Sequence, residues 1–167
     1  YEADDRLGGH ADTHVVAEGS RELAIDTGFI VHNRHTYPVL CRLFDELGVQ
    51  TQPSEMSLSV HDVATRLEWA GAKGRRGLFP EPRRVRDVGH WRMLAEIPRF
   101  HRAARRLLAS PPEAGDPTLD EFLDRHRFSD RLRRHFIRAL VAAVWSCDPE
   151  IAGRYPARHL FAFLANH

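Results

Sequence analysis

Cysteine is scarce in this sequence of 167 residues, which contains only Cys41 and Cys147 and no CxxC pair. A zinc framework and a dithiol redox centre are therefore not supported, and we expect two buried free thiols in a reduced, cytoplasmic setting. Lysine is almost absent, because Lys73 is the only one. The sequence also lacks an apolar run of the roughly 18 residues that a membrane-spanning helix requires.

No excess of charge of either sign is present, because 24 basic residues face 23 acidic ones and the formal net charge is +1. This balance gives no global reason to expect a nucleic acid or a membrane as partner. Hydrophobic residues make up 43% of the sequence, which is enough for a packed core. The length and the composition indicate one globular domain or two small ones.

The first third of the sequence predicts two short strands and a helix. Residues 11–16 and 23–25 are strand candidates. We expect Thr36 to cap a helix whose apolar residues recur at helical spacing as far as Leu47. Gly48 then stands where a left-handed C-terminal cap is usual.

The rest of the sequence predicts a hairpin followed by helices. Apolar and polar residues alternate within residues 56–69, which is typical of a β-hairpin, and the Gly-, Pro- and Arg-rich residues 71–90 are predicted to form a loop. A long helix is expected over about 91–109, and Pro98 is expected to kink or split it. Later helices are predicted after a capping box at Thr118, after Ser129 and from Pro156.

The beginning of the sequence carries the motif with most chemical content, Tyr-Glu-Ala-Asp-Asp-Arg-Leu-Gly-Gly-His. A carboxylate at the end of a strand, such as that of Glu2, can accept hydrogen bonds from the ribose hydroxyls of a dinucleotide. Gly8 and Gly9 lack side chains, so the backbone there can pass close to a cofactor. Arg6 either places a cation near a phosphate or forms a structural ion pair.

This run resembles the second cofactor motif of the flavin-containing amine oxidases, the protoporphyrinogen oxidases and the phytoene desaturases. The resemblance implies that Glu2 binds the ribose of FAD and that Arg6, Gly8 and Gly9 follow the diphosphate toward the flavin. Many amine oxidases have arginine where this sequence has His10, which is closer to the desaturase-like members. The resemblance therefore leaves open whether the substrate is an amine.

A second stretch, Ile-Asp-Thr-Gly-Phe-Ile at residues 25–30, resembles the segment of the same family that lies beside the isoalloxazine ring. Gly28 is the position of close approach that this resemblance implies, and Phe29, His32 and Asn33 are candidates to line the flavin pocket. An ordinary packing role is the alternative for each of them. The residues that the two stretches imply in FAD binding are Glu2, Arg6, Gly8, Gly9, His10, Gly28 and Phe29.

The resemblance implies an α+β fragment of a larger FAD-dependent oxidoreductase. Residues 1–52 are expected to be part of a Rossmann-like FAD-binding domain, and residues 53–167 part of a mainly helical substrate-binding domain with a β-hairpin. No Gly-x-Gly-x-x-Gly occurs, although the family's phosphate-binding turn would lie about 20–30 residues before Glu2. We therefore expect an internal fragment that binds FAD weakly or not at all and is inactive alone.

The reaction implied is hydride transfer from a C–N or C–C bond of the substrate to flavin. The sequence identifies no catalytic residue, electron acceptor or oligomeric state. An amine, a lipid chain and a polyene all remain open as substrates, and a hydrophobic small molecule is expected. Membrane association also stays open.

Two other functions, a metal site and an anion-binding module, are alternatives to the interpretation as a flavoprotein. His10, Asp12 and His14 alternate along a strand candidate, and histidine with carboxylate suits zinc or iron, but the order matches no metalloenzyme motif, and we expect no metal. The many arginines after residue 72 could instead form an anion- or nucleic-acid-binding module. A solvated helix face is the simpler account of these arginines, and we expect no nucleic acid partner.

Overall fold

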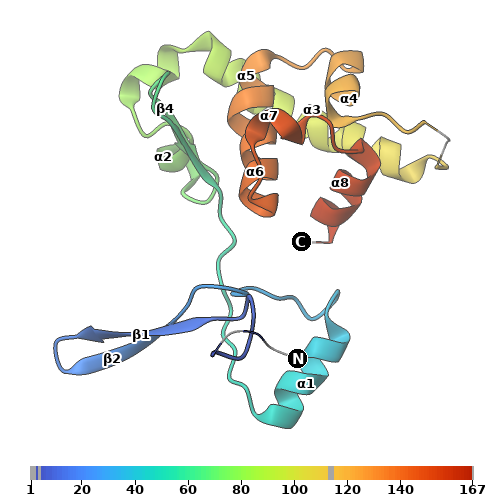
Figure 1. The fold of residues 1–167 in the computed structure, drawn as a ribbon. Coiled ribbons are helices and arrows are strands. Elements are labelled where there is room, and N and C mark those ends of the chain that lie inside the picture. Colours follow the sequence, from blue (N-terminus) through green and yellow to red (C-terminus); the bar gives the residue numbers. More distant parts are fainter. Residues whose placement is uncertain (1–2, 4, 113–114, 167) are drawn as a thin grey trace. The chain divides into compact units, whose positions relative to one another are not determined.

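The computed structural model describes residues 3, 5–112 and 115–166. The chain divides into two compact units, Tyr1–Ser54 and Glu55–His167, which we call the N-terminal unit and the C-terminal unit. The described residues form an α+β fold, in which two separate two-stranded antiparallel sheets accompany a larger number of helices (Figure 1). The α+β class predicted from the sequence is therefore confirmed. The Rossmann-like assignment and the roles predicted for the two parts stay predictions.

The N-terminal unit consists of a hairpin and a helix. Strands β1 (Thr13–Glu18) and β2 (Arg21–Asp26) pair from Thr13 opposite Asp26 to Glu18 opposite Arg21. Gly19 supplies the positive φ of 64° that the two-residue turn between them needs. Helix α1 (Pro38–Leu47) ends at Gly48, whose left-handed conformation confirms the predicted cap.

The predicted start of α1 is wrong by one residue. Tyr37, and not Thr36, precedes the first turn, and its side chain makes no capping hydrogen bond. The backbone N–H and the hydroxyl of Thr36 both donate to Oδ1 of Asn33, at 2.8 and 2.9 Å. Thr36 is therefore held in a turn before the helix, and Pro38 at the first helical position starts the helix instead.

No described residue of the N-terminal unit is buried. Val15 and Val16 follow each other in β1 and therefore point to opposite faces of the hairpin, yet both are exposed, as are their neighbours Leu23 and Ile25 in β2. A two-stranded hairpin is marginally stable in water without a packed face. The residues of the candidate cofactor site therefore lie on an open surface.

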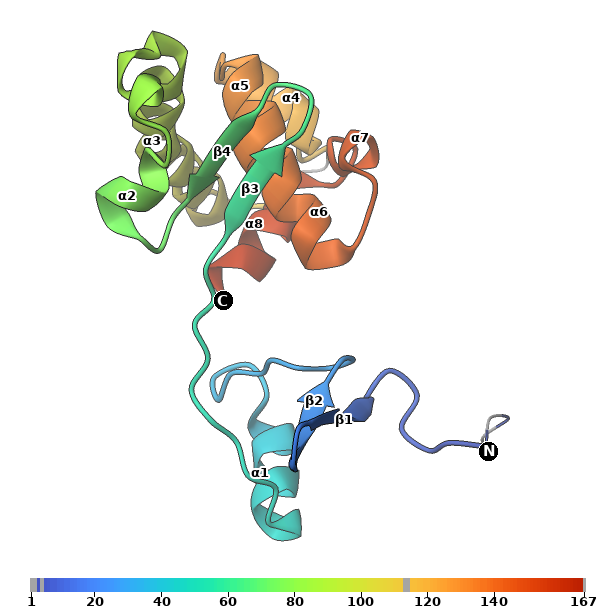
Figure 2. The same cartoon turned by 90° about the vertical axis from the view of Figure 1, so that its left-hand side faces the viewer.

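The C-terminal unit begins with a second hairpin, formed by β3 (Ser59–Asp62) and β4 (Leu67–Ala70) (Figure 2). Oδ1 of Asp62 accepts hydrogen bonds from the backbone N–H groups of Ala64 and Thr65, at 2.9 and 3.0 Å, which closes the turn. The predicted hairpin is confirmed, although its first strand begins later than the apolar alternation suggests. The side chain of Trp69 is buried, and its Nε1 donates to the backbone oxygen of His135 at 3.0 Å.

Helical segments make up the rest of the C-terminal unit. In chain order they are α2 (Gly74–Leu78), the 3-10 helix η1 (Pro82–Arg86), α3 (Val88–Ala109), α4 (Leu119–Arg125), α5 (Asp130–Leu132), the π-helical segment η2 (Arg133–Arg138), α6 (Ala139–Trp145), α7 (Pro149–Ala152) and α8 (Ala157–Ala165). The predicted loop at residues 71–90 was wrong, because α2 and η1 both lie within it. The predicted helix after Ser129 is α5, η2 and α6 in one continuous run.

Helix α3 continues through Pro98, so of the two predicted outcomes the split is wrong and the kink stays a prediction. A proline removes one backbone hydrogen bond from a helix, and here buried residues on both sides of it, Met93 and Phe100, anchor the two halves in the same core. The helix also begins earlier than predicted, because the side chain of Asp87 caps it by accepting from the backbone N–H of His90 at 3.1 Å.

Phe100 lies at the centre of the core of the C-terminal unit. Its ring meets four other rings edge to face, with centroid distances of 5.4–6.3 Å, and the four residues are Phe122, Phe128, Phe136 and Phe161. Edge-to-face contacts of this kind add to the free energy gained from burial alone. The rings come from α3, α4, η2 and α8 and from the segment after α4, so this cluster joins most of the unit.

Cys41 and Cys147 are free thiols, as predicted, but both are only partly buried. No helix in the described part of the chain is long and apolar enough to span a membrane.

Candidate cofactor site

The Gly-Gly-His segment forms a tight turn that Arg6 closes. Its guanidinium donates to the backbone oxygens of Gly9, at 2.9 Å, and Ala11, at 3.1 Å, and lies 3.3 Å from a carboxylate oxygen of Asp12. The amide of Ala11 donates to the backbone oxygen of Gly8 at 3.0 Å. Of the two roles open to Arg6, the structure shows the structural ion pair, and its hydrogen bonds shape the turn.

The two glycines of the turn are required for different reasons. A Cβ on Gly8 would lie 2.6 Å from the backbone oxygen of Ala11, and φ of Gly8 is +118°, so a side chain is excluded there by both contact and conformation. Gly9 has φ of +57° but nothing within 4 Å of its Cβ position. A ligand could therefore approach the backbone at Gly9, whereas the surroundings of Gly8 are filled by the protein.

The two stretches predicted to approach the flavin lie side by side. The amides of Thr27 and Gly28 both point to the backbone oxygen of Asp12, at 2.8 and 3.4 Å, and this contact continues the ladder of β1 and β2. The backbone oxygen of His10 occupies the space that a Cβ on Gly28 would need. The absence of a side chain at Gly28 is therefore explained by His10, and it permits the close contact of the two stretches.

Two aromatic contacts connect the second stretch to α1 and the residue before it. The ring of Phe29 meets that of Tyr37 edge to face at 6.0 Å, and the ring of His32 meets that of Phe44 at 5.1 Å. Phe29 is still 47% exposed, so part of its ring is open to a ligand. Glu2, the predicted ribose ligand, lies outside the described residues.

The open backbone of this turn fits a dinucleotide cofactor. Among the described residues, the amides of Gly9 and His10 make no hydrogen bond, and nothing lies within 4 Å of the position that a Cβ on Gly9 would take. Backbone N–H groups and a nearby guanidinium suit the oxygens of a phosphate, and a partly exposed aromatic ring suits the face of a flavin. Gly9, His10 and Phe29 are thus the described residues with room for FAD, while Arg6, Gly8 and Gly28 hold the backbone that presents them.

The histidines offer no competing metal centre in the described ranges, where no group of three or more His, Cys, Asp and Glu side chains converges. His14 instead pairs with Asp12 at 3.1 Å. His32 packs against Phe44, as described above. The alternation of His10, Asp12 and His14 in the sequence is consistent with an ordinary polar edge of the hairpin.

Many arginines of the C-terminal unit are paired with carboxylates. Arg131 meets Asp87 at 2.8 Å, and Arg158 meets Asp116 at 2.6 Å. Further pairs join Arg83 and Arg84 to Glu81, Arg92 to Glu96, Arg133 to Asp124, and Arg138 to both Asp120 and Glu150. Part of the arginine charge that suggested a phosphate-binding surface is thus neutralised within the fold.

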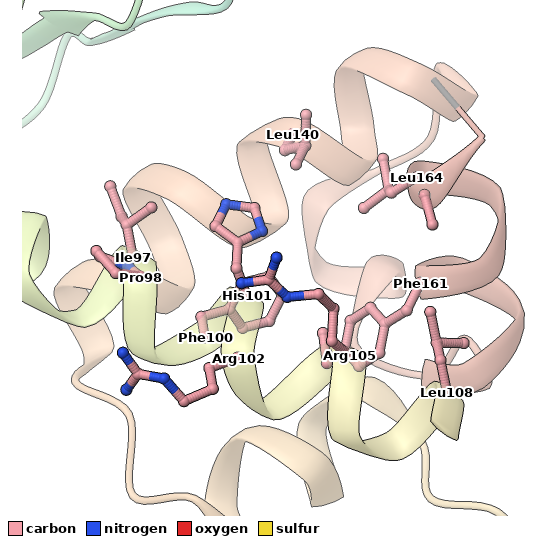
Figure 3. A pocket seen from close by; sticks show the side chains of 12 residues that line it. Ile97, Pro98, Phe100, His101, Arg102, Arg105, Leu108, Leu140, Phe161 and Leu164 are labelled. Carbon is pink, nitrogen blue, oxygen red and sulfur yellow. The ribbon is translucent and has the colours of Figure 1, made fainter. Parts of the chain in front are cut away.

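A groove in the C-terminal unit was not predicted from the sequence. It has a volume of about 730 Å³ and lies between α3, α6 and α8 (Figure 3). Its walls are mostly apolar, and the polar side chains that line it are His101, Arg102 and Arg105. The helices that line it were predicted from the sequence, but no local signal in the sequence places their apolar residues around a common space.

The model of the flavin containing amine oxidoreductase family matches residues 1–164, which is nearly the whole chain. The chain therefore belongs to the flavin containing amine oxidoreductases, which use a flavin as cofactor. A comparison with curated proteins gives no match to this chain. The family predicted from the first ten residues is thus confirmed, and the residues that bind the flavin remain predictions.

Proposed function

We propose that the N-terminal unit forms part of an FAD site in which the turn at Gly9 and His10 faces the cofactor. The convergence of this turn with Gly28 is the observation that carries the proposal, because it joins the two stretches with family resemblance at one backbone contact. FAD, when bound, supplies the acceptor for a hydride from the substrate.

Each residue of the proposed site has a separate task. The amides of Gly9 and His10 donate to the diphosphate, and Arg6 keeps the turn in the conformation that presents them. The exposed part of the Phe29 ring packs on the flavin, and the edge-to-face contact with Tyr37 holds the Phe29 ring in place. Glu2 accepts hydrogen bonds from the ribose, as the family motif implies.

The substrate that we propose is a small, mainly apolar molecule oxidised at a C–N or a C–C bond. The desaturase-like His10 after the glycine pair supports keeping C–C oxidation beside amine oxidation. Part of the arginine charge is paired with carboxylates, and no specific observation favours a nucleic-acid-binding module, so we do not propose one.

A comparison of two glycine variants tests the proposed site. Gly9 and Gly19 both have positive φ, +57° and +64°, and both have nothing within 4 Å of the Cβ position. Gly9→Ala and Gly19→Ala therefore introduce similar backbone strain, but only the first adds a methyl group beside the proposed diphosphate.

The FAD content of the purified intact protein is the measurement, taken as flavin absorbance per protein and as an affinity from titration of the apoprotein. Gly9→Ala is expected to weaken FAD binding at least about tenfold, in line with the loss of one charge-assisted hydrogen bond, and Gly19→Ala to leave it unchanged. Equal FAD binding by the two variants would contradict the proposal.

A further inference from the structure

The groove between α3, α6 and α8 combines an apolar interior with a cation that has no protein partner. Apolar side chains from all three helices line it, among them Leu108, Leu140, Phe161 and Leu164. None of the twelve lining residues is acidic. A volume of about 730 Å³ lies within the range of about 300–1,000 Å³ that is usual for small-molecule sites.

Arg105 is the cation at the centre of this groove. Figure 3 shows its guanidinium beside the ring of His101, whereas Arg102 extends away from Leu140 and Leu164. Among the described residues, Arg105 forms no ion pair and no hydrogen bond. Arg102, which also lines the groove, likewise forms no ion pair among the described residues, whereas Arg92 of the same helix pairs with Glu96.

His101 does not supply a counter-charge. Partial desolvation in the groove and the neighbouring Arg105 both hold the pKa of His101 below its usual value. The imidazole is therefore neutral near pH 7, where it can donate or accept a hydrogen bond without repelling an anion. An anion in the groove thus meets one guanidinium with its donors free and one neutral ring beside it.

We infer that this groove binds an amphipathic carboxylate, with the carboxylate on Arg105 and the apolar body against Leu108, Leu140, Phe161 and Leu164. A guanidinium binds a carboxylate through two parallel hydrogen bonds, and the apolar walls gain from covering a hydrocarbon chain. An amphipathic carboxylate matches both the apolar walls and the guanidinium of the groove. An uncharged hydrocarbon matches only the walls, and a small hydrophilic anion matches only the guanidinium. This binding is independent of the FAD site proposed above.

The test is calorimetric titration of the intact protein with dodecanoate, dodecan-1-ol and dodecylamine below their aggregation concentrations. Dodecanoate is expected to bind saturably and at least about tenfold more tightly than the alcohol, with the amine weakest. Shortening the chain to octanoate is expected to weaken binding by up to about fourfold for each methylene removed. Absence of saturable dodecanoate binding, or equal binding of the alcohol, would overturn the inference.

Two neighbouring arginines of α3 provide a matched pair of variants. Arg105→Gln and Arg106→Gln remove the same charge from adjacent exposed positions, but Arg106 does not line the groove. The first is expected to weaken dodecanoate binding about tenfold and the second less than about twofold, with Arg105→Lys between them. Equal losses in the two variants would show a general charge effect and overturn the inference.

A membrane surface is the other source of carboxylate and phosphate groups next to hydrocarbon. Vesicles of anionic phospholipid therefore form a separate arm of the experiment. Binding to vesicles that depends on Arg105, without saturable binding of monomeric dodecanoate, would replace the small-molecule site by a lipid contact and overturn the inference. Saturable binding of monomeric dodecanoate that depends on Arg105, measured without vesicles, supports it.

Discussion

The backbone oxygen of His10 lies against the α-carbon of Gly28, in the space where any other residue would carry its Cβ atom. This relationship connects the turn after the first motif to the end of β2, and the two amides that point to Asp12 reinforce it. The fold itself therefore requires glycine at position 28, whether or not a cofactor is bound. The contact brings the turn at Gly9 and His10 next to the stretch at Gly28, so that both could face the same cofactor.

Gly28→Ala is expected to separate these two stretches. The added methyl group meets a backbone oxygen that cannot rotate away, so we expect a cost of about 1–3 kcal/mol, as for other overpacked positions. Amide hydrogen exchange measures the effect, and Thr27 and residue 28 are expected to exchange faster because their bonds to Asp12 lengthen. Gly71→Ala is the control, because its nearest neighbour is the oxygen of Leu58 at 3.9 Å. Unchanged exchange at Thr27 would show that the contact is not tight.

Phe100→Ala is expected to destabilise the C-terminal unit strongly. The side chain is 2% exposed and touches four aromatic rings from different segments, so its removal leaves a cavity that these rings cannot easily fill. A loss of about 3–5 kcal/mol in the free energy of unfolding is expected. Denaturant unfolding followed by the fluorescence of the three tryptophans, all of which lie in this unit, measures it. Val88→Ala, at an exposed position of the same helix, is the control and is expected to change the free energy by less than about 0.5 kcal/mol.

His135 gives the C-terminal unit a dependence on pH. Its ring lies 3.2 Å from Asp62, but burial lowers the pKa of His135 more strongly than Asp62 raises it, and Arg134, Arg131 and Arg84 lower it further. The folded state therefore favours the neutral ring. The contribution of the neutral His135 to the free energy of unfolding is fully present above the pKa of about 6.5 that histidine has in the unfolded chain. This contribution is lost as the pH falls through the lower pKa that His135 has in the folded state.

Melting temperatures measured between about pH 7 and pH 5 test whether the C-terminal unit loses stability as the pH falls. The wild-type melting temperature is expected to fall over this window, and His135→Asn is expected to reduce the fall. Part of the fall persists in the variant, because desolvation and nearby arginines also lower the pKa of His126. The pKa of Asp62 is lowered mainly by the hydrogen bond from the backbone of Thr65, so this carboxylate titrates below the window. An identical fall in variant and wild type would contradict the assignment to His135.

Local signals in the sequence predicted local structure well. The capping box of α4 was predicted because both of its partners lie within four residues, and Glu121 accepts from the backbone of Thr118 at 2.8 Å while the hydroxyl of Thr118 accepts in return at 3.3 Å. The prediction for Thr36 used the same rule and was wrong, because the side chain of Asn33 takes both of its donors. A residue three positions away decided the outcome, and the capping rule does not consider it.

Contacts between segments far apart in the chain could not be predicted from the sequence. The motif at residues 1–10 identified the family, but the contact of His10 with Gly28 depends on the register of β1 and β2. The groove depends on helices that lie far apart in the chain, and only the folded structure shows which arginines line it and which of them pair with carboxylates. Spacing rules cannot predict which charges the fold will leave unpaired.

Hydrogen exchange of the intact protein, with and without FAD, tests the proposed cofactor surface most directly. The account predicts that FAD slows exchange at Gly9 and His10, whose amides make no hydrogen bond among the described residues, and in the stretch around Phe29. The hairpin turn at Gly19, which is equally exposed, is predicted to exchange at the same rate in both states. Protection by FAD elsewhere in the protein, with Gly9 and His10 unchanged, would contradict the account.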